Sequence, residues 1–309
     1  MTYRKEFEKI IENIKIGPNA SYEEIHRLSS PMMQFIGKNI PNQLYKFRGC
    51  TDYSIDAFEK DELWLSKAAL FNDLHDSLFF FDKNTILNSI KKRFESDEVP
   101  SMVETMKKVQ FSNPELQKQI LERLSSLNGP QLSDEVQQSI PEFDRFLDQC
   151  FSVAREGIRE RIKMVCLSES IKSPLMWAHY ADNHKGFAIR YDFRNNEITQ
   201  CSNCPNRSCT DIKFGIIYPV IYSNKRYDAT EYGQWVVQQQ LNRMIGIPMK
   251  ELYNDAFLFT KVALYKSNDW SYENEWRMTC STPNPAIEQK DRYPIKEATY
   301  SNLFWLPDS

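Results

Sequence analysis

Glycine is scarce in this chain, which has only 9 glycines among 309 residues. Neither G-x-G-x-x-G nor G-x-x-x-x-G-K-[ST] occurs, although these are the patterns by which Rossmann and P-loop proteins wrap phosphates. Both folds therefore have little support. A nucleotide would have to be held without a glycine-rich loop.

Positive charge is not in excess either, because 39 Lys and Arg face 42 Asp and Glu, for a net charge of -3. No overall positive field would draw the protein to nucleic acid or to an anionic membrane. No apolar run approaches the roughly 20 residues of a membrane-spanning helix. Residues Met1–Lys15 mix both charges, unlike a secretory signal or a transit peptide. We therefore expect a cytoplasmic protein with no membrane partner.

Histidines number only 4, and no G-x-S-x-G occurs, so a hydrolase triad has little support. In a cytoplasmic protein we do not expect the 7 cysteines to form disulfides. Cys201, Cys204 and Cys209 form a C-x2-C-x4-C that could grip one metal. A closed zinc site needs a fourth ligand, which would have to come from a distant side chain such as Cys280, His179 or His184. We expect free thiols here and no zinc.

The first 70 residues predict helices and short strands. Apolar residues at helical spacing over Tyr3–Ile16, and a capping box of Ser21 and Glu24, predict two helices. Strands are expected at Gln43–Arg48 and Leu63–Ser66, with a short helix at Ser54–Phe58 between them.

From residue 84 to 163 the pattern is helical throughout. Pro114–Leu127 and Ile140–Ile162 each place apolar residues on one stripe, and Asn128-Gly129-Pro130 separates them. Strands are then expected at Met164–Ser168, Phe187–Tyr191, Ile216–Tyr222, Glu275–Cys280 and Ala298–Leu306, with helices at Trp235–Ile245 and Glu251–Tyr265. These patterns predict a single α+β domain over residues 1–309, interrupted by a helical insertion at 84–163.

The most informative motif is W-S-Y-E-N-E-W-R at Trp270–Arg277. In an extended strand Glu273 and Glu275 would point to the same side. One interpretation is a solvated edge strand on which Arg277 or Lys266 pairs the charges. The other is a carboxylate pair that stabilises a cationic transition state, such as the oxocarbenium ion formed when a glycosidic bond breaks.

Two further polar groups follow predicted strands. Arg48 ends the run L-Y-K-F-R, where it is either a surface charge or a guanidinium able to grip a pyrophosphate or ribose. Ser168 and Ser170 follow Met164–Leu167 and would share one face in extended geometry.

A dense group of aromatic and imidazole side chains lies between Pro174 and Phe187. Trp177 and Tyr180 offer flat faces that could stack on a nicotinamide or nucleobase, although both could equally be core residues. His179 lies beside them, and a hydrogen-bonded imidazole at the margin of the core is its structural interpretation.

The motifs L-Y-K-F-R, L-W-L-S followed by F-N-D, C-L-S, M-W-A-H-Y-A-D-N-H-K-G-F and W-S-Y-E-N-E-W-R resemble a widespread bacterial family of uncharacterised domains. The resemblance covers about Leu44 to Arg277 outside the insertion. Leu74 and His75 depart from it, because the family tends to have proline and an aromatic residue there. That family in turn resembles ADP-ribosyltransferases, including toxins of phage-defence systems that modify nucleic acid.

This resemblance implies a mixed, mainly antiparallel split sheet of ADP-ribosyltransferase type, with NAD as co-substrate. From the order of the motifs in ADP-ribosyltransferases, the resemblance implies that Glu275 is the catalytic carboxylate and that Glu273 orients or deprotonates the acceptor. The residues implied in binding NAD are Arg48 on the phosphates or ribose, Ser168 and Ser170 beside the nicotinamide, and Trp177, His179 and Tyr180 around its ring.

The expected function is transfer of ADP-ribose to a macromolecule, with RNA or DNA favoured over protein, by an intracellular toxin or antiviral effector. An antitoxin or chaperone is a possible partner. Two alternatives stay open: a non-catalytic module that binds a nucleotide or partner, and a metal-dependent nuclease using Asp52, Asp73, Asp76 and Glu275.

Overall fold

The computed structural model describes residues 2–17, 19–60, 62–71, 76–77, 79–95, 104, 107–108, 114–126, 129–192, 217–244, 253–280, 292–294 and 300–305. Contacts divide the chain into two compact units. The first comprises residues 1–78, 158–227 and 254–309, and the second comprises 79–157 and 228–253. In the described ranges no helix is both long and apolar enough to cross a membrane.

The first unit combines helices with an antiparallel sheet, so the α+β class is confirmed. Its helices are α1 (Tyr3–Glu12), α2 (Tyr22–Asn39), α3 (Asp52–Glu59), η1 (Ala68–Leu70), α8 (Pro174–Tyr180), α10 (Leu258–Leu264) and η2 (Asn268–Glu273). Its strands are β1 (Leu44–Arg48), β2 (Glu62–Trp64), β3 (Ser66–Lys67), β5 (Lys163–Ser168), β6 (Phe187–Tyr191), β7 (Ile217–Pro219), β8 (Ile221–Tyr222), β10 (Tyr265–Lys266), β11 (Glu275–Cys280), β12 (Arg292–Pro294) and β13 (Tyr300–Trp305).

The main sheet has the order β13-β6-β1-β5-β11-β7, and β3 adds to β5. β1 pairs with β6 along its whole length, and β11 pairs with β5 along its whole length. Between these two halves, β1 and β5 pair only at Tyr45 and Ser168. Lys46 Nζ donates to the carbonyl oxygen of Cys166 at 3.0 Å, next to the point where this ladder stops. A side-chain donor therefore satisfies a strand carbonyl where the two strands separate.

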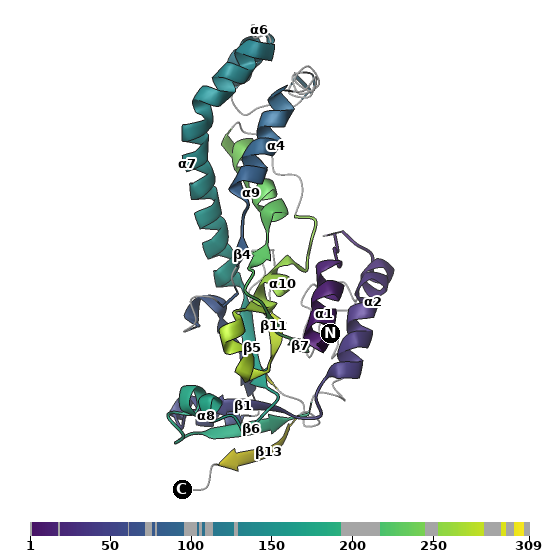
Figure 1. Ribbon diagram of the computed structural model, residues 1–309, viewed down its shortest axis with the longest axis vertical. Coiled ribbons are helices and arrows are strands. Elements are labelled where there is room, and N and C mark those ends of the chain that lie inside the picture. Colours follow the sequence, from purple (N-terminus) through teal and green to yellow (C-terminus); the bar gives the residue numbers. More distant parts are fainter. Residues whose placement is uncertain are drawn as a thin grey trace. The chain divides into compact units, whose positions relative to one another are not determined.

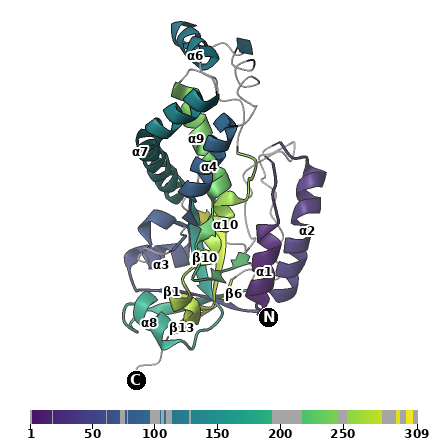
Figure 2. The same ribbon diagram turned by 45° about the horizontal axis from the view of Figure 1, so that its top comes forward.

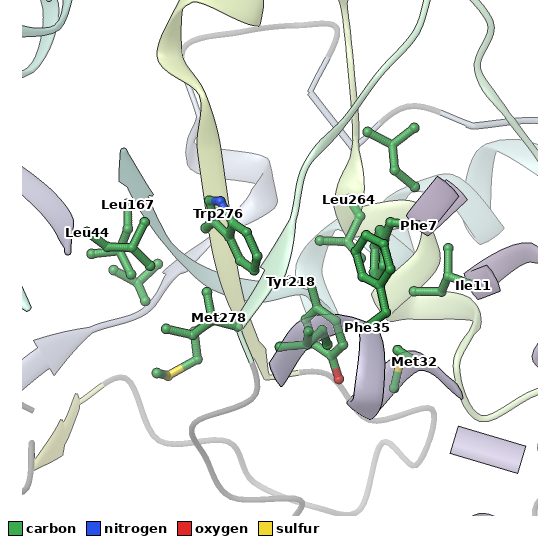
Figure 3. Packing of buried hydrophobic residues seen from close by; sticks show 14 of the residues in the cluster. Phe7, Ile11, Met32, Phe35, Leu44, Leu167, Tyr218, Leu264, Trp276 and Met278 are labelled. Atoms are coloured by element: carbon green, nitrogen blue, oxygen red, sulfur yellow. The ribbon is translucent and has the colours of Figure 1, made fainter. Parts of the chain in front are cut away.

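Each face of this sheet is covered by helices. On one face, α1 and α2 lie side by side in both views (Figure 1, Figure 2). Figure 3 shows Phe7 of α1 and Phe35 of α2 close together, and their ring centroids are 5.6 Å apart. The same apolar cluster includes Leu44, Leu167 and Trp276 from three neighbouring strands. On the other face α8 packs on β1, because Trp177 meets Phe47 edge to face at 5.0 Å.

The second unit consists mainly of helices: α4 (Lys83–Glu95), α6 (Pro114–Ser126), α7 (Gly129–Arg161) and α9 (Thr230–Met244). From Ile158 onward, α7 belongs to the first unit. Two short strands, β4 (Phe79–Phe80) and β9 (Tyr227–Asp228), pair with each other. The second unit thus includes α9 as well as the helices that follow residue 82.

Most elements agree with the sequence patterns. The capping box is confirmed, because Ser21 Oγ accepts a hydrogen bond from the Glu24 N–H at 3.2 Å. Some predictions are wrong in part. The strand at Leu63–Ser66 is interrupted at Leu65, and the strand at Ile216–Tyr222 is divided at Val220 into β7 of the main sheet and β8, which pairs with β10. In the described part of Glu251–Tyr265 the helix is confined to Leu258–Leu264, after which the chain extends as β10.

Candidate functional site

The segment that carries Glu273 and Glu275 is not a continuous strand. Glu273 ends the 3-10 helix η2, Asn274 has a left-handed conformation with φ 43°, and Glu275 begins β11. The prediction that strand alternation brings the two carboxylates together is therefore wrong. They converge nevertheless, because Lys266 Nζ donates to Glu273 Oε2 at 2.5 Å and to Glu275 Oε2 at 2.9 Å.

These two glutamates belong to a buried ionic cluster, which we define as Asp76, Lys266, Glu273, Glu275 and Arg277. The Arg277 guanidinium donates to Asp76 through Nη1 at 2.7 Å and Nη2 at 2.5 Å, and to Glu275 Oε1 through Nε at 2.7 Å. No side chain of the cluster is more than 5% exposed. β11 lies between β5 and β7 in the sheet. The interpretation as a solvated edge strand is therefore wrong, although both predicted cations do pair the carboxylates.

The cluster contains three carboxylates and two cations, so one negative charge is left over when all three acids are ionised. Burial alone would raise the pKa of Glu275, but Arg277 and Lys266 outweigh it and hold that pKa well below its usual range. Burial, and then the charge of Glu275, raise the pKa of Glu273 to about 7. Near neutral pH the charge of the cluster is thus set by Glu273, and a group that titrates near the working pH is suited to acid–base chemistry.

Of the two predicted serines, Ser168 contacts the backbone of this segment. Ser168 lies opposite Glu275 in the β5–β11 register, and its hydroxyl donates to the carbonyl oxygen of Glu273 at 2.7 Å. Ser168 Oγ also accepts from the Ser170 N–H at 3.3 Å. Ser168 therefore fixes the position of Glu273. A direct contact of either serine with nicotinamide stays a prediction.

Arg48 lies at the end of β1, two strands away from β11. Its side chain is half-buried, and within the described ranges it makes no hydrogen bond or ion pair. Burial lowers the pKa of Arg48. Lys46, two residues earlier on the same strand, has a pKa lowered to about 8 by burial and by the charge of Arg48, against the opposing pull of Glu275 and Glu273. The effect of Glu275 and Glu273 on its pKa places Lys46 in the neighbourhood of the carboxylates, and sequence reasoning missed it. Among the described residues, no carboxylate has such an effect on Arg48, whose titratable neighbours are Tyr191, Tyr53 and Cys166.

The aromatic candidates divide into two groups. Trp177 is only 3% exposed, packs in the core and donates its indole N–H to the carbonyl oxygen of Ile171 at 2.6 Å, which fits its structural interpretation. The Tyr180 hydroxyl instead donates to Glu273 Oε1 at 2.7 Å. His179 is exposed and lies 6.2 Å from Trp270 and 6.5 Å from Tyr272, measured between ring centroids. Trp177 is thus a core residue, whereas a ring-binding role for Tyr180 or His179 stays a prediction.

Cys201, Cys204 and Cys209 lie outside the described residues. Among the residues that are described, no group of three or more His, Cys, Asp or Glu is arranged to hold a metal ion. Of the residues proposed for a nuclease, Asp76 and Glu275 are bridged by Arg277, Asp52 begins α3, and Asp73 is not among the described residues. A protein cation therefore occupies the position between the two carboxylates that are brought together.

A pH experiment can isolate the titration of Glu273. Its ordinary pKa is 4.5, and the folded value is about 7. Between these values the unfolded chain has lost a proton that the folded chain retains, so raising the pH destabilises the parent protein by up to about 1.4 kcal/mol per unit through this group. Glutamine does not titrate. We therefore expect Glu273→Gln to gain stability relative to the parent from about pH 5 to 7 in urea unfolding. A difference that stays constant with pH would contradict the raised pKa.

Comparison with known proteins gives one match. No curated protein and no solved structure matches the chain. Residues 176–278 match the model of a family described as a protein of unknown function, DUF2971. The matched stretch runs from α8 through β11 and contains Lys266, Glu273, Glu275 and Arg277, whereas Arg48 lies before it. The chain therefore contains, at residues 176–278, a domain of an uncharacterised family that carries most of the ionic cluster.

Proposed function

We propose that the protein is an ADP-ribosyltransferase that transfers ADP-ribose from NAD to a macromolecular acceptor. The observation that carries the proposal is the buried carboxylate pair, in a cluster whose three carboxylates exceed its two cations by one negative charge and in which Glu273 titrates at about 7. Breaking the bond between the nicotinamide nitrogen and C1′ of the ribose leaves positive charge on the sugar. A fixed negative charge in a water-poor site stabilises that charge.

The two carboxylates have different roles in this proposal. Arg277 and Lys266 together use both oxygens of Glu275, so this group is neutralised by its partners and serves to hold the cluster together. Glu273 supplies the negative charge and accepts a proton. The C1′–N bond breaks with its electron pair on nicotinamide, a nucleophilic oxygen or nitrogen of the acceptor bonds to C1′, and the proton of that nucleophile passes to Glu273. Glu273 thus keeps the role toward the acceptor that the order of the motifs implies and takes over from Glu275 the stabilisation of the positive charge.

Arg48 and Lys46 are our candidates for binding the diphosphate of NAD. They lie on the same side of β1, where β1 has separated from β5, and the described residues offer Arg48 no carboxylate. An arginine fork suits a diphosphate because it donates two parallel hydrogen bonds. Tyr180 and His179 are the candidates beside the nicotinamide ring.

The nature of the acceptor rests on the resemblance to nucleic-acid-modifying toxins, which favours RNA. A toxin or antiviral role in the cytoplasm, and an antitoxin or chaperone that restrains it, belong to the same proposal. The net charge of -3 means that any nucleic-acid contact would depend on a local basic surface.

The decisive experiment is to incubate the purified protein with NAD and measure free nicotinamide, with and without total cellular RNA. We expect release of nicotinamide and transfer of label from NAD carrying a labelled adenine to RNA. Addition of EDTA should leave the rate unchanged. Binding of NAD without release would instead favour a binding module. Loss of nucleic acid cleavage on chelation, with no NAD chemistry, would favour a nuclease.

A further inference from the structure

The backbone around the two glutamates is held by contacts from several distant elements. The carbonyl oxygen of Asn274 accepts from the Glu169 N–H at 3.2 Å, and the Glu275 N–H donates to the Tyr222 hydroxyl at 2.8 Å. The carbonyl oxygen of Glu275 accepts from the Val220 N–H at 3.0 Å and from Arg4 Nη1 at 2.8 Å. With the bond from Ser168 to Glu273, each peptide carbonyl from 273 to 275 has a donor.

Arg4, in the first turn of α1, joins three of these elements. Its guanidinium donates to the carbonyl oxygens of Glu275 and Val220 at 2.8 and 2.9 Å, and to Glu169 Oε1 at 2.7 Å. Glu169 Oε1 also accepts from the Tyr3 hydroxyl and from Trp276 Nε1, the latter at 2.7 Å. The Arg4 side chain is 11% exposed and that of Glu169 is 28% exposed. We call Tyr3, Arg4, Glu169 and Trp276 the N-terminal clamp.

We propose that Arg4 of α1 and Glu169, which directly follows β5, are positioning residues that fix the Glu273–Glu275 segment. Neither residue contacts a carboxylate of the ionic cluster in the described contacts, so their action passes through the backbone. The expected effect of Arg4 on catalysis rests on the proposed function. The expected effect of Arg4 on the position of Glu273 does not depend on that function.

A positioning role and a purely electrostatic role of Arg4 predict opposite changes in the pKa of Glu273 when the Arg4 side chain is removed. If Arg4 acted only as a nearby positive charge, its removal would disfavour the ionised carboxylate and raise that pKa. If Arg4 holds the segment in its buried place, its removal admits water, reduces the desolvation that raises the pKa to about 7, and lowers the pKa toward 4.5. The sign of the shift therefore separates the two roles.

The experiment measures the pKa of Glu273 by NMR of carbon-labelled glutamate carboxyl groups, assigned with Glu273→Gln. We expect Arg4→Met to lower the pKa by a unit or more, and Arg4→Lys to lower it by less, because lysine keeps the charge without the planar fork. Lys5→Met is the matched control, since Lys5 is an exposed cation on the same helix. It should leave the pKa unchanged.

A pKa of Glu273 that is unchanged or raised in Arg4→Met would overturn the positioning role. If Arg4→Met does not fold, Arg4→Lys and Tyr3→Phe decide the question by the same shift, and no shift in either overturns it. In the NAD assay we expect Arg4→Met to lower kcat by about 10²-fold, the size of effect that a misplaced reacting group causes, with KM for NAD unchanged. Should the parent protein release no nicotinamide, the proposed function fails while the NMR result still decides the clamp.

Discussion

Replacing Glu273 by glutamine is expected to lower kcat for nicotinamide release by about 10²- to 10⁴-fold, the range found for general acid–base groups. Glutamine keeps the shape of the side chain, and its one oxygen can still accept from Lys266 while its NH2 donates to the Tyr180 hydroxyl; these partners lie 2.5 and 2.7 Å from the two carboxylate oxygens. It removes the one negative charge that the cluster does not neutralise. The measurement is steady-state kinetics with NAD at pH 8, above the pKa of about 7.

The control is Glu156→Gln, which makes the same chemical change on an exposed position of α7. It should retain the parental rate. In the parent protein kcat should rise with pH through about 7, because ionisation of Glu273 generates the active form. A Glu273→Gln protein that works within about threefold of the parent would refute the assignment. Glu275→Gln is a less selective test, because it also deprives Arg277 and Lys266 of a partner.

Replacing Arg277 by methionine should lower the free energy of unfolding by about 3 to 5 kcal/mol, the cost of removing one partner from a buried ion pair. The guanidinium is 0% exposed and binds both Asp76 and Glu275. Without it, Lys266 is the only cation left in the cluster, and it lies 3.8 Å from Asp76. Urea unfolding at pH 7 measures the loss.

Arg145→Met serves as the control, since Arg145 is exposed on α7, and it should change stability by less than about 0.5 kcal/mol. A double mutant with Asp76→Asn tests the reason for the loss. We expect the destabilisation of the double mutant to be smaller than the sum of the two single destabilisations by 1 kcal/mol or more. The reason is that a buried charge destabilises the fold mainly when its partner has been removed. A loss below 1 kcal/mol for Arg277→Met would mean that water compensates the carboxylates.

Local patterns predicted much of the fold. The boundaries of β6 and β11 coincide with the predicted strands, and α2 begins at the predicted capping box. These features depend on neighbouring residues, which the sequence displays directly. The break at Leu65 and the extended backbone of β10 depend instead on pairing with strands from elsewhere in the chain, so propensity alone did not reveal them.

In the candidate site, too, local sequence revealed some features, whereas others depend on contacts between distant residues. The motif identified Glu273 and Glu275, but the reason for their convergence was different, because Asn274 turns the chain where alternation was expected. Arg4 gave no signal, and Asp76 was considered only as a metal ligand of the nuclease alternative, since these residues reach the segment from 271 and 201 residues away. A charged residue in an ordinary helical or turn sequence looks like surface. Only tertiary packing shows that it is buried.

The separation of these partners along the chain has a consequence for synthesis on the ribosome. The central strands of the sheet come from residues 44–48, 163–168 and 275–280, so β11 enters more than 100 residues after β5 has been made. Pairings between such remote segments form slowly, because the entropy of closing a long loop is lost before the contacts between the strands contribute any stabilisation. A nascent chain released before Glu275 would expose the apolar faces of β1 and β5 and would have no carboxylate pair, so the chemistry proposed here can begin only after β11 has been synthesised.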